Sequence, residues 1–132
     1  MEFFRKVTVK TTENDIHQRL TLGNLDMIST EIFNLDEPGE HQVQIGGIWG
    51  EFTLTRNIIK GGCRFALVEC PNALCWTITT GYPPDPESII VHLTINRTEK
   101  DDEFIEEITD FLNDMCQNLN HSFSQEKIKL NQ

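Results

Sequence analysis

Hydrophobic and polar residues alternate with a period of two along the first part of the chain, as in strands that bury one face. Residues 3–10 alternate in this way, and residues 16–22 repeat the pattern before Gly23-Asn24, a pair that favours a two-residue hairpin turn. Residues 25–35 fit helical or strand spacing, and we interpret them as a strand because they are rich in Ile, Thr and Phe. The pattern therefore predicts a strand-rich beginning.

Further strands are predicted after the turn at residues 36–39. They cover residues 41–45, 48–56, 63–70, 75–80 and 88–96. Gly46-Gly47 indicates a tight turn or a bulge between the first two, and apolar residues on both faces of 63–70 favour a central strand covered on both sides. Short connections favour an antiparallel meander, because parallel strands need long crossovers. The pattern leaves open whether the sheet stays open or curls into a small barrel.

The last regular element is an amphipathic helix over residues 99–119. Thr98 to Asp101 resemble a capping box in which Asp replaces Glu. Apolar residues then recur at helical spacing and form one stripe that suits packing on a sheet. The residues of this stripe are Phe104, Ile105, Ile108, Phe111, Leu112, Met115 and Leu119.

These elements predict one α+β domain over residues 1–132. We expect a mainly antiparallel meander sheet of about six to eight strands, open or strongly curved, with the C-terminal helix packed on it. A polar tail over residues 120–132 follows the helix, and we expect it to be partly disordered.

The net negative charge of the chain makes some classes of binding partner unfavourable. The chain has 132 residues, with 21 acidic and 11 basic side chains and a formal net charge of −10. This charge opposes binding to nucleic acid or to an anionic membrane. No apolar run approaches the roughly 20 residues needed to cross a bilayer, and the first residues lack the order of a signal peptide. We therefore expect a cytoplasmic protein without nucleic-acid or membrane partners.

The predicted helix carries most of the negative charge. Residues 99–114 hold eight acids and one base, Lys100. The acids on the face opposite the apolar stripe are Glu103, Glu106, Glu107, Asp110 and Asp114. Because this excess exceeds what helix stability requires, we predict that these five residues, together with Trp49, bind a basic protein partner. The simpler alternative is a solvated acidic face, with both tryptophans packed between sheet and helix.

Reactive side chains form no known catalytic or metal-binding pattern. Cys70 and Cys75 are expected to face each other across a four-residue loop, where a labile disulfide is geometrically feasible. With Cys63 as a third ligand their spacing is a poor match to a zinc site, so buried or half-exposed thiols are the simpler interpretation. The histidines do not cluster along the sequence, and only an unsupported pairing of His92 with a thiol suggests catalysis. We predict no catalytic residue, no cofactor and no metal.

Two functional hypotheses follow. The first is a small acidic, non-enzymatic binding protein, most concretely an inhibitor or immunity-type protein that engages a basic protein. The alternative is a small-molecule carrier or chaperone with an apolar cavity under a curved sheet, near Trp49 or Trp76. A tightly filled core would argue against that cavity.

Overall fold

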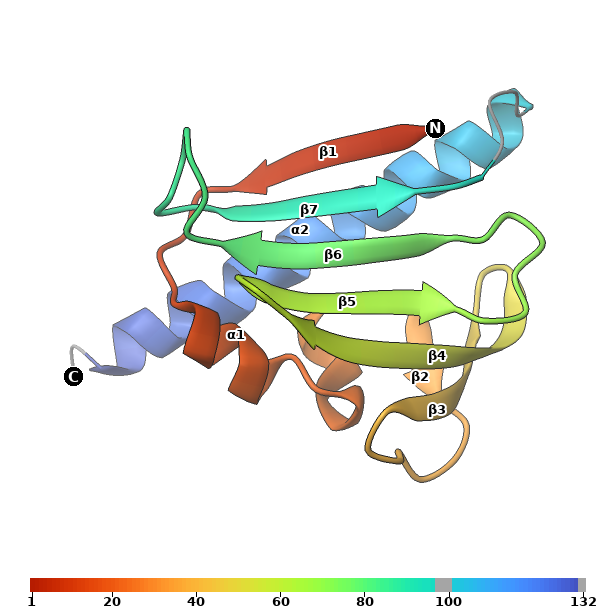
Figure 1. Cartoon of the computed structure of the whole chain (residues 1–132), viewed down its shortest axis with the longest axis horizontal. Coiled ribbons are helices and arrows are strands. Elements are labelled where there is room, and N and C mark those ends of the chain that lie inside the picture. The colour runs from red at the N-terminus through yellow and green to blue at the C-terminus, as the bar shows by residue number, and fades with distance from the viewer. Residues whose placement is uncertain (97–100, 131–132) are drawn as a thin grey trace.

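A seven-stranded antiparallel sheet forms the body of the protein (Figure 1). The computed structural model describes residues 1–96 and 101–130. The strands are β1 (Glu2–Val7), β2 (Ile32–Asn34), β3 (Gln42–Gly47), β4 (Gly50–Ile59), β5 (Gly62–Leu67), β6 (Cys75–Thr80) and β7 (Ile89–Thr94). Consecutive strands from β2 to β7 are neighbours, and β1 pairs with β7 at the far edge. The predicted antiparallel meander with a C-terminal helix is confirmed.

All the helices described lie against this sheet. They are α1 (Glu13–Arg19), the 3-10 helix η1 (Leu22–Met27) and α2 (Asp102–Leu130). The long α2 crosses behind the sheet in Figure 1, and α1 packs against β5 and β6. No helix in the described part of the chain is long and apolar enough to span a membrane.

The core lies between the sheet and α2. Apolar residues at alternate positions of β6 and β7 point inward, and α2 supplies the matching stripe, including the predicted Ile108, Phe111 and Leu119. Trp76 stacks on Phe65 with ring centroids 5.6 Å apart and meets Phe111 edge-on at 5.4 Å. Each such fully buried side chain stabilises the fold by roughly 1.5–3 kcal/mol relative to exposure, so this contact holds helix and sheet together.

Residues 16–22, predicted as a strand, instead complete α1 and begin η1. Thr12 starts α1, since its side chain accepts a hydrogen bond from the Asp15 N–H at 3.0 Å. Ile16 and Leu20 are both fully buried, because residues four apart share one side of a helix. Gly23-Asn24 therefore lies inside η1 and is not a hairpin turn. The prediction was wrong because these apolar positions fit periods of two and of 3.6 equally well.

Two further strand boundaries differ from the prediction. Within residues 25–35 only β2, three residues long, is a strand. Gly46-Gly47 belongs to β3, and the turn to β4 is formed by Ile48 and Trp49. A Cβ atom on Gly46 would lie 2.8 Å from the Phe33 ring, so glycine lets this ring lie directly over β3.

The cysteine geometry also differs from the prediction. Cys75 pairs with Ala66 across β5 and β6, so Cys70, in the loop between them, does not face Cys75. All four cysteines are free thiols. Burial raises the pKa of the Cys63 thiol, which therefore stays protonated at neutral pH. The expectation that residues 63–70 form a strand covered on both faces is not met, since on the outer face of β5 Arg64 is exposed and Ala66 is only half-buried.

The helix α2 is longer than predicted. The Thr98, Glu99 and Lys100 positions of the predicted capping box lie outside the described residues, but the Asp101 carboxylate accepts a hydrogen bond from the Phe104 N–H at 2.8 Å. The helix then continues through much of the predicted polar tail to Leu130. Phe123 explains part of this extension, because its ring is buried beneath the guanidinium of Arg19 at 4.4 Å.

Candidate functional site

The carrier hypothesis placed a ligand in the space between the sheet and α2. Beside Trp76 and Phe111 this space holds a cavity of about 10 Å³, roughly the volume that one water molecule needs. The indole N–H of Trp76 has no hydrogen-bond partner among the described residues. Both tryptophans pack between sheet and helix, in agreement with the simpler interpretation of the sequence.

Trp49 closes one end of this space. It comes from the turn between β3 and β4, and its ring meets Phe104 at 6.0 Å and Phe111 at 5.4 Å, both edge-on. Its Nε1 donates a hydrogen bond to the Glu107 carboxylate at 2.7 Å. Trp49 and Glu107, both predicted to bind a partner, are thus half-buried and bound to each other.

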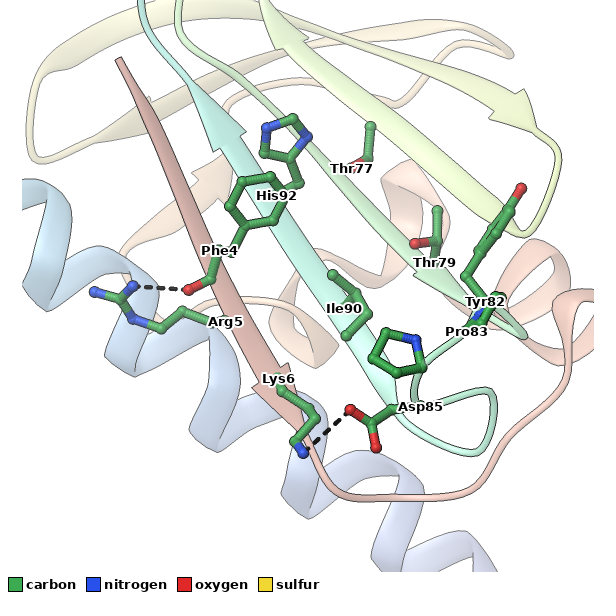
Figure 2. Close-up of a pocket in the computed structure, with 11 residues that line it drawn as sticks. Phe4, Arg5, Lys6, Thr77, Thr79, Tyr82, Pro83, Asp85, Ile90 and His92 are labelled. Carbon is green, nitrogen blue, oxygen red and sulfur yellow. Dashed lines mark hydrogen bonds and ion pairs between the residues drawn. The ribbon is translucent and has the colours of Figure 1, made fainter.

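A larger concavity lies on the opposite face of the sheet (Figure 2). It is a groove of about 610 Å³ over the outer face of β1, β7 and β6, with the loop between β6 and β7 as one wall. Two rows of side chains, paired across the strands, form its floor. The rows are Phe4–His92–Thr77 and Lys6–Ile90–Thr79. We call this concavity the outer groove.

Internal contacts fix the aromatic side chains of the outer groove. The Phe4 ring stacks on His92 with centroids 4.2 Å apart and planes 2° apart, yet Phe4 remains 59% exposed. His92 Nε2 lies 3.0 Å from the Glu2 carboxylate. On the loop side, the Tyr82 hydroxyl donates to the Lys60 carbonyl at 3.0 Å. A Cβ atom on Gly61 would lie 2.5 Å from the Tyr82 ring, so glycine allows that ring its position.

Polar groups converge on the same groove. Lys6 Nζ lies 3.3 Å from an Asp85 carboxylate oxygen and thereby ties the loop to β1. The hydroxyls of Thr77 and Thr79 line the floor (Figure 2), and neither bonds to another described residue. Apolar ring surfaces with a few polar groups at fixed positions are typical of small-molecule sites. Within residues 1–96 and 101–130, no group of three or more His, Cys, Asp or Glu side chains is arranged to hold a metal ion.

The acidic face of α2 divides into two groups. Glu103, Glu106 and Asp110 are exposed, and none forms an ion pair with another described residue. Asp114 instead holds the segment between η1 and β2. Its two oxygens accept hydrogen bonds from the Ser29 hydroxyl at 2.6 Å, the Thr30 N–H at 3.0 Å and the Thr30 hydroxyl at 2.5 Å. Three of the five predicted carboxylates therefore remain open to a partner.

Sequence patterns did not predict the outer groove. His92 lies on the outer face of β7, and its neighbours Phe4 and Thr77 belong to strands that are distant in sequence or separated by a loop. The pairing of β1 with β7 brings these residues together, and no local signal encodes that pairing. The apolar Phe4 and Ile90 on a mainly polar outer face were the available hint.

Comparisons with known proteins identify the fold. No protein-family model matches the chain, and no curated protein sequence matches it either. An uncharacterised protein from Bacillus thuringiensis has a similar structure, with a TM-score of 0.65 and 13% identity over 93% of this chain and 98% of that one. The protein XoxI from Bacillus cereus gives a TM-score of 0.66 at 13% identity over 96% and 97% of the two chains. A START superfamily protein from Mycobacterium smegmatis gives 0.60 at 12% identity over 94% and 97%. The chain therefore shares the α+β fold of these proteins, an antiparallel sheet with a C-terminal helix.

Proposed function

We propose that this protein is a small-molecule-binding protein and that the outer groove is its binding site. The observation that carries this proposal is the groove itself, whose volume of about 610 Å³ lies in the range of ligand sites. Its floor combines the ring of Phe4 and the side chain of Ile90 with two uncommitted threonine hydroxyls. The cavity beside Trp76 and Phe111, with about 10 Å³, is too small for such a ligand.

The outer groove is preformed in the absence of a ligand. The Phe4–His92 stack, the Lys6–Asp85 ion pair and the anchored Tyr82 hydroxyl hold its floor and wall in place. A preformed site loses little conformational entropy on binding, which favours affinity for small ligands.

Screening small aromatic compounds against the ¹⁵N-labelled protein by NMR tests this function. We expect ligands to shift backbone amide signals of β1, β6 and β7. Thr79→Arg should fill the groove and abolish these shifts, whereas Asn57→Arg, an exposed position on β4, should preserve them. The proposal is wrong if no compound shifts these amides, or if the shifts persist in Thr79→Arg.

A second candidate function is binding of a basic protein, as by an inhibitor or immunity-type protein. It is favoured by the three exposed carboxylates Glu103, Glu106 and Asp110, which lie at helical spacing on one face of α2. Charges arranged in this way accelerate association and make affinity depend on salt.

Exchange of these three carboxylates tests the second candidate. The wild-type protein and a Glu103→Lys/Glu106→Lys/Asp110→Lys variant would each be used as bait in the native host's lysate at low salt. We expect a basic protein to elute from the wild type as salt rises and to be missing from the variant. Retention of the same partner by the folded variant would exclude this surface. Glu107 is left unchanged, since it holds Trp49.

A further inference from the structure

We infer that the outer groove selects ligands that join an apolar ring to a carboxylate, with the carboxylate at Lys6. This inference rests on the proposed small-molecule function and adds the chemical class of the ligand. It follows from how charge, hydroxyl groups and ring surfaces are distributed along the two rows of the floor.

The lining of the groove is less acidic than the chain as a whole. The protein carries a formal charge of −10, whereas the Asp and Lys or Arg residues that line the groove are Arg5, Lys6 and Asp85. Arg5 points away from the floor in Figure 2, and its Nη1 donates to the Phe4 carbonyl at 2.9 Å. Lys6, whose side chain lies in the floor itself, is therefore the cation that we pair with a ligand carboxylate.

Lys6 retains hydrogen-bonding capacity for a ligand. Its side chain is 49% exposed, and its contact with Asp85 is 3.3 Å long. An ammonium group has three N–H donors, so two remain after the bond to Asp85. The Thr79 hydroxyl lies in the same row of the floor, beyond Ile90. A carboxylate above Ile90 could accept from both groups, and charge-assisted bonds of this kind are stronger than neutral ones.

The other row of the floor suits a ring. Phe4 and His92 present a stacked pair at one end, and the two rows are two residues apart along each strand, about 7 Å. A ring over the Phe4 row and a carboxylate over the Lys6 row would span this distance. The reverse orientation is unfavourable, because Glu2 lies beside His92 and would repel an anion there.

Three probes of similar shape separate ring binding from charge selection. They are 3-phenylpropanoate, its amide 3-phenylpropanamide and the cation 3-phenylpropylammonium, each titrated into the protein and followed by amide shifts in β1, β6 and β7. We expect the carboxylate to bind roughly fivefold more tightly than the amide, as a half-exposed ion pair allows. The cation should bind more weakly than the amide.

Substitutions at Lys6 and Asp85 test whether Lys6 causes the preference for the carboxylate over the amide. Lys6→Gln should bring the carboxylate and the amide to equal affinity, whereas Asp85→Asn should increase the preference, since a competing carboxylate is removed. Lys10→Gln is the matched control, because Lys10 pairs with Glu87 at 3.2 Å and does not line the groove. That variant should keep the wild-type preference.

The outcomes distinguish this inference from the function on which it rests. If the amide binds as tightly as the carboxylate, or if Lys6→Gln keeps the preference, the ligand class is wrong and small-molecule binding stands. If none of the three probes shifts the amide signals of the groove, both proposals are wrong: the ligand class and the binding of aromatic rings in the groove.

Discussion

Replacing Asp114 with alanine separates a structural role from a partner-binding role. The Asp114 carboxylate accepts hydrogen bonds from Ser29 and Thr30. Thr30 is exposed, so water can replace the carboxylate there. Ser29 is only 1% exposed, and a buried donor that loses its charged acceptor costs about 1–3 kcal/mol. Since alanine also favours the helix by about 0.5 kcal/mol, we expect Asp114→Ala to lower the free energy of unfolding by about 1.5 kcal/mol.

Asp110→Ala is the matched control for this experiment. It makes the same substitution one turn earlier in α2, at an exposed residue, so we expect a change within about 0.5 kcal/mol. Urea unfolding followed by tryptophan fluorescence measures both variants, and with typical slopes the two midpoints should differ by about 1 M.

A double-mutant cycle with Ser29→Ala identifies the bond responsible. The Ser29 hydroxyl lies 2.6 Å from the Asp114 carboxylate, and we expect a coupling energy of about 1 kcal/mol between the two substitutions. Equal stability of Asp114→Ala and Asp110→Ala, or additive effects in the cycle, would refute the assignment of Asp114 as an anchor.

Three further substitutions test other parts of the structure. Burial and two α2 carboxylates raise the pKa of Glu31 above its ordinary value of 4.5, so Glu31→Gln should raise Tm at pH 7, with the gain disappearing below pH 4.5. Hydrogen bonds from Thr53 lower the pKa of Glu69. The ionised Glu69 carboxylate therefore stabilises the fold above pH 4.5, and this stabilisation is lost as the pH falls. Glu69→Gln should make the Tm depend less on pH in the acid range. Phe111→Ala should cost about 3–5 kcal/mol and enlarge the space under the sheet, so added indole should raise the Tm of the variant more than the Tm of the wild type.

The long helix and the later strands could be predicted from sequence because one local period dominates each of them. The stripe of α2 repeats over several turns, and the helical period is the only one that fits it. The segment around Ile16 and Leu20 is too short to distinguish the helical period from the strand period. The available signal was Thr12 before Glu13 and Asp15, an N-cap with acids in the first turn.

The functional site was less predictable than the fold, for a physical reason. Asp114 and Asp110 look alike in sequence, and only the approach of Ser29 to the helix makes one of them an anchor. The outer groove depends on Phe4 lying beside His92, a contact between distant residues that no periodicity encodes. Counting charges along the sequence identified the acidic face of α2, whereas a net charge of −10 gave no indication that Lys6 lies in the floor of a groove.

The pairing of β1 with β7 has a consequence for the order of folding. The Met1 amino group donates to the carbonyl of Ile95, 94 residues away, while β3 and β4 are joined by a two-residue turn. Closing a loop of that length costs about 4 kcal/mol of chain entropy, and contacts between distant residues form slowly. We therefore expect the meander from β3 to β7 to assemble first and β1 to join it last. The outer groove, whose floor includes Phe4 and Lys6, would then become able to bind only at the final step of folding.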